Sequence, residues 1–293
     1  YMNLLEKFKN KKIKKRFFRV FRPFFVSHKL NNRSNLVWMI GSGRSGSTWI
    51  SSILNYYLKY RELFEPLHPK WIDEFGEKKT HHYFNEKMPN HLSNKFISKL
   101  KGKGYTFEID YTNDRFFYKG ILTKDIYSNL YAYQIKKRAP SLKIILLIRN
   151  PFDVALSKQE RKSWGWADNP GEFLNQHQLM QDFLNPFRQI IEEVIAKEDY
   201  IVNLILTWAI IYYVPLKQFK KKDLLIVFYE KVYLNPVDEI NRIQQYIGKT
   251  NKNHKIPKEV IRKKSHVTIN SSDNLKSKTL KNIWKEKLTN FNF

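Results

Sequence analysis

Apolar and polar positions alternate along the chain in a way that predicts strands and helices in turn. Short apolar runs at 36–40, 120–124 and 141–148 are typical of buried strands, and residues 63–64 end a further one. After the first run, apolar residues from 49 to 57 recur with a period of about 3.6 residues, which predicts a helix. Strands that alternate with helices favour a parallel sheet covered on both faces. We therefore predict an α/β fold of three layers, α/β/α, around a central, mostly parallel sheet.

Three further stretches are assigned from the same patterns. Residues 105–110 alternate like a strand, and residues 126–138 are helical up to a proline. The most apolar stretch, 201–216, is shorter than the roughly 20 residues of a membrane-spanning helix and contains Asn203 and Pro215. We predict that it is a buried core helix.

Between the first strand and the first helix lies a loop of small residues. A strand, a glycine-rich loop and a helix together hold phosphate, because backbone N–H groups converge there with the positive end of the helix dipole. Gly41, Gly46 and Thr48 match the spacing of the triphosphate loop G-x-x-x-x-G-K-[ST], but Ser47 replaces the lysine. That replacement argues against triphosphate chemistry, and the cation here is Arg44. An ordinary strand-to-helix turn stays open as the alternative.

Composition narrows the class of protein. A chain of 293 residues fits one large α/β domain, with two domains as the alternative. The absence of cysteine excludes disulfides, thiolate nucleophiles and cysteine–zinc sites. A net charge of +26 implies an anionic partner such as a nucleotide, an acidic glycan, nucleic acid or anionic lipid.

The N-terminal segment carries much of this charge. Residues 1–25 hold nine Lys or Arg and six Phe against the single acid Glu6. Such a mixture suits an amphipathic helix on an anionic membrane surface, and a solvated or docked basic arm is the alternative. The stretch lacks the apolar core and cleavage site of a signal peptide. We predict an N-terminal arm over 1–35, with membrane association as one of its two alternatives, and a single domain over 36–293.

A carboxylate follows the second strand. Glu65 stands between that strand and Pro66, and the carboxyl ends of parallel strands face the ligand crevice. Glu65 is therefore expected near the phosphate loop, although a surface carboxylate in a turn is the commoner fate of a glutamate. The polar stretch 68–104 contains scattered histidines without the spacing of a metal site, so no metal is assigned.

A second anion motif follows the strand at 141–148. Arg149 ends that strand, Pro151 can begin a helix, and Asp153 suits its first turn. Arg149 and Ser157 are placed to reach one anion, and an arginine without an anion would be a costly way to end a buried strand.

The segments GSGRSGSTW and IRNPFDVALS, taken together, resemble the two cofactor-binding motifs of sulfotransferases that use 3′-phosphoadenosine 5′-phosphosulfate (PAPS), which have a P-loop-like nucleotide-binding fold. The resemblance implies that the first motif binds the 5′-phosphosulfate and that Arg149 and Ser157 bind the 3′-phosphate. Trp49 matches a position beside the adenine. The first-motif residues are Arg44, Ser45, Gly46, Ser47 and Thr48.

The resemblance extends to both sides of these motifs. The RSGST loop and the FEP segment are similar to the carbohydrate-modifying branch, where a glutamate at the position of Glu65 is a plausible base. Lys124 resembles a lysine that touches the transferred group. Residues 223–248 match the last core strand and helix of the family. Arg262 and Lys263 fall where relatives bring basic residues over the 3′-phosphate, although Lys264 replaces the usual glycine.

We therefore predict sulfuryl transfer from PAPS to a hydroxyl of a carbohydrate or glycolipid. In-line transfer needs a base, a cation at the leaving oxygen and a rigid cradle, and no magnesium. Glu65 is the candidate base, with Asp125 and Asp110 in reserve, and Arg44 is the candidate stabiliser of the leaving phosphate.

Two other functions stay open beside this one. The first is a P-loop kinase or NTPase-like phosphotransferase, which would have a similar loop but would not account for the second motif. The second is a non-enzymatic protein that binds membranes or nucleic acid, which would account only for the positive charge. No specific nucleic acid is expected as a partner. A cytoplasmic enzyme peripheral to a membrane is expected, with a lumenal location open.

Overall fold

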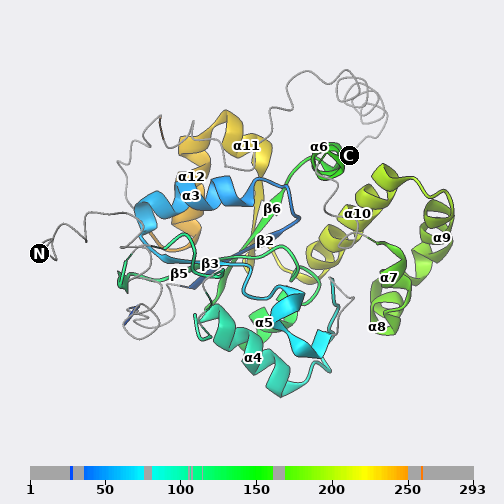
Figure 1. Cartoon of the computed structure of the whole chain (residues 1–293), viewed down its shortest axis with the longest axis horizontal. Helices are drawn as coiled ribbons and strands as arrows, with labels where there is room; N and C mark the ends of the chain where they lie inside the picture. Colours follow the sequence, from blue (N-terminus) through cyan, green and yellow to red (C-terminus); the bar gives the residue numbers. More distant parts are fainter. Residues whose placement is uncertain are drawn as a thin grey trace, which may run out of the picture.

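A parallel sheet of five strands organises the computed structural model of the chain (Figure 1). The structure describes residues 27–28, 36–75, 81–104, 106, 108–113, 115–160, 169–249 and 259. All four strand pairs of the sheet are parallel. In spatial order the strands are β3 (Arg61–Phe64), β5 (Ile121–Lys124), β2 (Leu36–Gly41), β6 (Lys143–Ile148) and β7 (Leu224–Phe228).

Helices cover both faces of this sheet. Successive strand residues point to opposite faces, so Val37 and Met39 pack in one core cluster while Trp38 and Ile40 pack in the other. The first cluster includes residues of α3 (Ser47–Leu58) and α12 (Pro236–Tyr246), and the second includes residues of α4 (Asn90–Leu100), α5 (Ala132–Arg138) and α10 (Tyr200–Gln218). The predicted three-layer α/β/α fold with a parallel sheet is confirmed.

The remaining elements lie around these layers. A two-residue strand β1 (Ser27–His28), inside the predicted arm, pairs in parallel with β4 (Phe117–Tyr118). Helix α6 (Pro151–Gln159) packs on α10, and α11 (Tyr229–Leu234) links β7 to α12. The other short elements are η1 (Pro69–Trp71), η2 (Asp73–Phe75), α7 (Gly171–Leu174), α8 (His177–Leu179), η3 (Met180–Leu184), η4 (Asn185–Phe187) and α9 (Arg188–Ala196).

Helix α10 is the apolar stretch predicted to be a core helix. By length and hydropathy it is the one helix among the described residues that meets the criterion for crossing a membrane. Its Ile210, Ile211 and Val214 are buried in the same cluster as Trp38 of the sheet. The core-helix prediction is confirmed by this packing.

Two predicted elements differ from the structure, and one helix was not predicted. Residues 108–110, predicted as part of a strand, form a turn in which the Asp110 N–H bonds to the Thr106 carbonyl. The helix predicted over 126–138 begins only at α5, because the Asp125 carboxylate accepts hydrogen bonds from the Tyr127 N–H and the Ser128 hydroxyl and so stabilises a turn. Helix α4 lies in the polar stretch where no helix was predicted.

Candidate functional site

The glycine-rich loop joins β2 to α3 at the carboxyl edge of the sheet. Arg44 and Gly46 adopt positive φ angles of 69° and 85°, which curl the chain. The Ser45 N–H and hydroxyl both donate to the Ser42 carbonyl, at 3.3 and 2.7 Å. Helix α3 then begins at Ser47, and the first N–H groups of a helix have no acceptor within it. The loop therefore offers N–H groups and the positive end of a helix dipole to an anion.

A buried tyrosine fixes this loop to the sheet. The Tyr212 hydroxyl of α10 accepts from the Ser42 N–H at 2.9 Å and donates to the Leu147 carbonyl of β6 at 2.7 Å. Burial raises the pKa of the Tyr212 hydroxyl, so it stays a donor at neutral pH. The start of the loop is therefore tied to the strand that leads into the second anion motif.

The second motif begins where β6 ends. Asn150 caps α6, since its side chain accepts from the Phe152 N–H at 2.9 Å and the Asp153 N–H at 3.3 Å, and Pro151 is the first helical residue as predicted. The Asn150 N–H in turn donates to Glu230 of α11 at 2.9 Å. These bonds fix the helix that carries Ser157.

The structure brings the two motifs into direct contact. The Arg149 guanidinium donates to the Arg44 carbonyl at 3.0 Å, and the Arg44 Nε donates to the Ser157 hydroxyl at 2.9 Å. Arg149 also lies 3.9 Å from Asp153. The Nε of Arg149 is buried and has no hydrogen-bond partner among the described residues. A buried unpaired donor beside a second arginine fits an anionic ligand.

Sequence reasoning missed Tyr229, which joins the two motifs through its ring. The ring lies so close to Gly46 that a Cβ there would approach two ring carbons to 2.4 Å. The Arg149 guanidinium lies 4.5 Å from the ring centroid, and Trp49 meets the ring edge-on at 5.6 Å between centroids. In the sequence, only its position could have indicated a role for Tyr229. It directly follows β7, and so it lies at the edge of the sheet that carries the two motifs.

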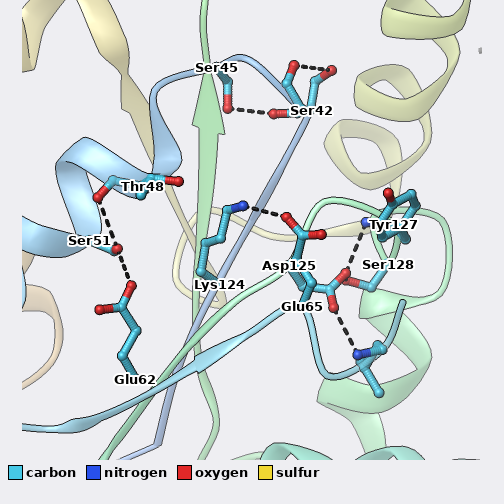
Figure 2. Close-up of polar contacts among 12 residues, drawn as sticks. Ser42, Ser45, Thr48, Ser51, Glu62, Glu65, Lys124, Asp125, Tyr127 and Ser128 are labelled. Atoms are coloured by element: carbon cyan, nitrogen blue, oxygen red, sulfur yellow. Dashed lines mark hydrogen bonds and ion pairs between the residues drawn. The ribbon is translucent and has the colours of Figure 1, made fainter. Parts of the chain in front are cut away.

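Glu65 and Lys124 form an ion pair at the ends of β3 and β5 (Figure 2). Glu65 has a φ of 48°, uncommon for a residue with a side chain, and its N–H donates to the Lys124 carbonyl at 2.7 Å. Lys124 is 5% exposed, and its ammonium lies 4.1 Å from the Phe64 ring centroid. Glu65, the predicted base, and Lys124, the lysine expected to touch the transferred group, therefore lie together at the carboxyl edge of the sheet.

The two reserve carboxylates are engaged elsewhere. Asp125 is buried and accepts from the Tyr127 N–H, the Ser128 hydroxyl and the Leu67 N–H, so it fixes the turns after β3 and β5. Burial raises the pKa of Asp125 to about 6.

Asp110 forms a buried pair with Arg61, with bonds of 2.7 and 2.6 Å. Arg61 begins β3 and Glu65 follows its last residue, so Asp110 lies at the opposite end of that strand from the ion pair. The geometry therefore favours Glu65 over both reserve carboxylates.

A cavity of about 370 Å³ lies beside Glu65. Three of its walls are aromatic, and the lining residues are Phe64, Glu65, His68, Lys70, Trp71, Glu108 and Tyr111. The Nδ1 of His68 accepts from the Lys70 N–H at 3.1 Å, and burial lowers the pKa of His68 to about 4. His68 is therefore neutral at pH 7, and the carboxylate that pairs with Lys124 beside the cavity is Glu65.

Some predicted residues lie outside the part that the structure describes. These are Arg262, Lys263 and residues 1–25. Within the described part, no group of three or more His, Asp or Glu side chains is arranged to hold a metal ion.

The fold and the site together define an α/β protein with two anion-binding motifs and a buried ion pair at one edge of a parallel sheet. The family model "Sulfotransferase domain" matches residues 34–292. The chain belongs to this sulfotransferase family, and the prediction of the family is confirmed. A comparison with curated protein sequences gives no significant match.

Several solved structures that are similar to this chain are sulfotransferases. The enzyme from Alicyclobacillus acidocaldarius is 12% identical, with 85% of this chain and 90% of that chain covered and a TM-score of 0.44. Mouse sulfotransferase SULT7A1, solved with PAP (3′-phosphoadenosine 5′-phosphate), is 16% identical over 78% of this chain and 63% of that chain, with a TM-score of 0.42. Sulfotransferase STF9 from Mycobacterium avium is 12% identical, with 89% of this chain and 78% of that chain covered and a TM-score of 0.43.

Proposed function

We propose that this sulfotransferase moves a sulfuryl group from PAPS to a hydroxyl of a carbohydrate or glycolipid. The observation that carries the proposal is the direct contact between the Arg44 and Arg149 motifs, next to the Glu65–Lys124 pair. Two anion motifs in contact suit one ligand with phosphate at two ends. A carboxylate near them suits removal of a proton from an acceptor.

The donor is held through the two motifs. The loop residues Ser45, Gly46, Ser47 and Thr48 bind the 5′-phosphosulfate, with the N–H groups of Gly46, Ser47 and Thr48 directed to it. Arg44 lies where negative charge grows on the leaving phosphate. Arg149 and Ser157 bind the 3′-phosphate, and Trp49 with Tyr229 lies beside the adenine. By resemblance, Arg262 and Lys263 complete the 3′ site. The family's chemistry needs no metal in this scheme.

Transfer then follows a single in-line displacement. The acceptor oxygen forms a bond to sulfur while the bond between sulfur and the bridging phosphate oxygen breaks, and the electron pair of that bond stays on PAP. The acceptor proton moves to the Glu65 carboxylate. Lys124 contacts the sulfuryl oxygens, and its ammonium is released from Glu65 as that carboxylate becomes neutral.

The acceptor proposal rests on the cavity beside Glu65. Its size lies near the lower end of the roughly 300–1,000 Å³ range of ligand pockets, which suits a sugar unit. Aromatic walls at Phe64, Trp71 and Tyr111 can stack on the apolar face of a pyranose ring, while Lys70 and Glu108 offer polar partners. A membrane-bound arm over 1–25 would bring the enzyme to glycolipid acceptors, as a protein peripheral to the cytoplasmic membrane surface.

A radiolabelled transfer assay tests the proposal. The full chain is incubated with ³⁵S-labelled PAPS and a panel of neutral glycans, acidic glycans and glycolipid vesicles, in parallel with a chain that lacks residues 1–25. Label is expected to appear in a sugar acceptor, with glycolipid acceptors depending on the arm. Transfer only to simple phenols or steroids would contradict the acceptor class. Phosphoryl transfer from ATP without sulfuryl transfer would contradict the proposal that PAPS is the donor.

A further inference from the structure

Two neighbouring strands lead directly into the second anion motif and into α11. Ile148 of β6 pairs with Phe228 of β7, and this is the last pair of the ladder between them. The chain continues from β6 into Arg149 and α6, and from β7 into α11, which begins at Tyr229 at the same edge of the sheet (Figure 1). Residues that directly follow paired strand ends lie across from one another, so the first residues of α11 face the second anion motif.

The side chain of Glu230, the second residue of α11, supplies a hydrogen-bond acceptor where the ladder ends. A backbone N–H group that is removed from water needs an acceptor, but the main chain after β7 turns into a helix. The Asn150 N–H donates to Glu230 Oε1 at 2.9 Å. An ionised carboxylate is a strong acceptor for an N–H group. The peptide unit between Arg149 and Asn150 is therefore held by a side chain of the neighbouring helix.

The residue before Glu230 contacts the side chain of the same arginine. The Arg149 guanidinium lies 4.5 Å from the centroid of the Tyr229 ring, and it donates to the Arg44 carbonyl at 3.0 Å. Two consecutive residues of α11 therefore hold two parts of one motif: the Tyr229 ring contacts the guanidinium, and the Glu230 carboxylate holds the backbone that follows it. Without the bond from Asn150, the end of β6 could move away from α11, and the contacts of the Arg149 guanidinium would loosen.

We propose that Glu230 is a positioning residue that holds Arg149 in the orientation in which it binds the 3′-phosphate. This role rests on the proposed function of Arg149. The Arg149 Nε is buried and has no hydrogen-bond partner among the described residues, so it can donate to a phosphate oxygen only where the guanidinium keeps this place. Glu230 acts through Asn150 and Arg149 and does not touch the nucleotide.

Glu230→Ala removes the acceptor of the Asn150 N–H and leaves Arg149 itself unchanged. PAP affinity, measured by calorimetry, should weaken by about threefold to tenfold, as expected for the loss of one intramolecular hydrogen bond. Affinity for adenosine 5′-monophosphate, which lacks the 3′-phosphate, should change by less than about twofold, because Arg149 is not expected to contact that nucleotide. The ratio of the two affinities therefore reports on the 3′ end of the ligand.

Two further variants separate the hydrogen bond from other effects. Glu230→Gln keeps a side-chain oxygen that can accept from the Asn150 N–H, so its PAP affinity should stay within about twofold of the wild-type value. Losses as large as those in Glu230→Ala would overturn the proposal. The matched control is Glu239→Ala, which removes a carboxylate from the first turn of α12, where it lies 2.7 Å from Arg242. This control should change the affinity for neither nucleotide.

Two measurements test whether Glu230 acts through Arg149. In a chain that already carries Arg149→Ala, Glu230→Ala should weaken PAP binding by less than about twofold, because residues that act through one another do not have additive effects. The Arg149 side chain is also followed by NMR on chain labelled with ¹⁵Nε-arginine, with its signal assigned by its absence in Arg149→Lys. That signal should shift in Glu230→Ala and stay in place in Glu239→Ala.

The outcomes are distinguishable. An unchanged Arg149 signal in folded Glu230→Ala would overturn the role of Glu230 whether or not the nucleotide binds. Equal losses of affinity for PAP and adenosine 5′-monophosphate, or additive losses in the double variant, would make Glu230 merely structural and would also overturn it. A shifted Arg149 signal in Glu230→Ala, together with a wild-type chain that binds PAP no more tightly than adenosine 5′-monophosphate, would overturn the proposed function of Arg149 while its positioning by Glu230 stands.

Discussion

The proposed donor side and the proposed acceptor side of the site are built in different ways. The donor side, at the ends of β2 and β6, uses backbone N–H groups, helix starts and two arginines that contact one another. The acceptor side, at the ends of β3 and β5, uses one buried ion pair and a cavity with aromatic walls. The first arrangement fits the fixed geometry of a nucleotide, and the second leaves room for an acceptor. Changes on the donor side should therefore alter nucleotide affinity, whereas changes on the acceptor side should alter turnover.

The largest expected effect is on the acceptor side. Glu65→Gln removes the proposed base and keeps the size of the side chain, so turnover should fall by roughly two to four powers of ten. PAP affinity should stay within about threefold of the wild-type value, which corresponds to about 0.65 kcal/mol, because Glu65 lies outside the two anion motifs. Initial rates with labelled PAPS and PAP calorimetry measure the two quantities. Near-normal turnover would remove Glu65 from the role of base.

The next effect is on the donor side, at Gly46. Gly46→Ala places a methyl group against the Tyr229 ring at a residue with φ of 85°. Backbone strain of about 1–3 kcal/mol, together with the clash, should weaken PAP binding by about a hundredfold. Gly104→Ala is the matched control, because Gly104 has a φ of 81° but has no atom within 4 Å of the added Cβ. Equal losses of PAP affinity in both variants would show that contact with Tyr229 has no part in forming the site.

Arg149 separates the two ends of the nucleotide. Arg149→Ala should weaken PAP by about tenfold to a hundredfold, as expected for lost hydrogen bonds to a charged group of roughly 1.5–3 kcal/mol. Adenosine 5′-monophosphate, which lacks the 3′-phosphate, should lose much less affinity. Calorimetry with both ligands makes the comparison, and equal losses would contradict the 3′-phosphate assignment.

The smallest effect concerns the wall of the acceptor cavity. The pKa of His68 is lowered to about 4 in the folded chain from 6.5, so between these pH values the unfolded chain binds a proton that the folded chain does not. His68 therefore makes the free energy of unfolding rise with pH between about pH 4 and pH 6.5. Above that window it does not change how the free energy of unfolding depends on pH. Protonation would also break the bond from the Lys70 N–H to Nδ1.

His68→Gln should flatten this rise by about 1 kcal/mol after allowance for solvent screening. Urea unfolding at pH 4.5 and pH 7 measures the difference in each protein. An equally steep rise in the variant would mean that other groups, such as buried His81 with a pKa of about 3, set the pH dependence.

The positions of the two anion motifs could be predicted from the sequence, whereas contacts between distant elements could not. Arg44, Gly46 and Arg149 stand in short local patterns, and their chemistry follows from a strand end and a helix start. Tyr229 packs against residues of elements far apart in the chain, and no local pattern records such contacts. The start of α5 could not be predicted for a similar reason. The side chain of Asp125 stabilises a turn in a stretch whose periodicity is helical.

One binding measurement tests the central claim most directly, namely that the two motifs hold the two ends of one nucleotide. The full chain is titrated by calorimetry with PAP, with adenosine 5′-monophosphate, and with ATP in the presence of magnesium. We predict that PAP binds at least about tenfold more tightly than either of the others, which corresponds to roughly 1.4 kcal/mol for the second phosphate site. Equal affinity for PAP and adenosine 5′-monophosphate, or tighter binding of ATP, would contradict it.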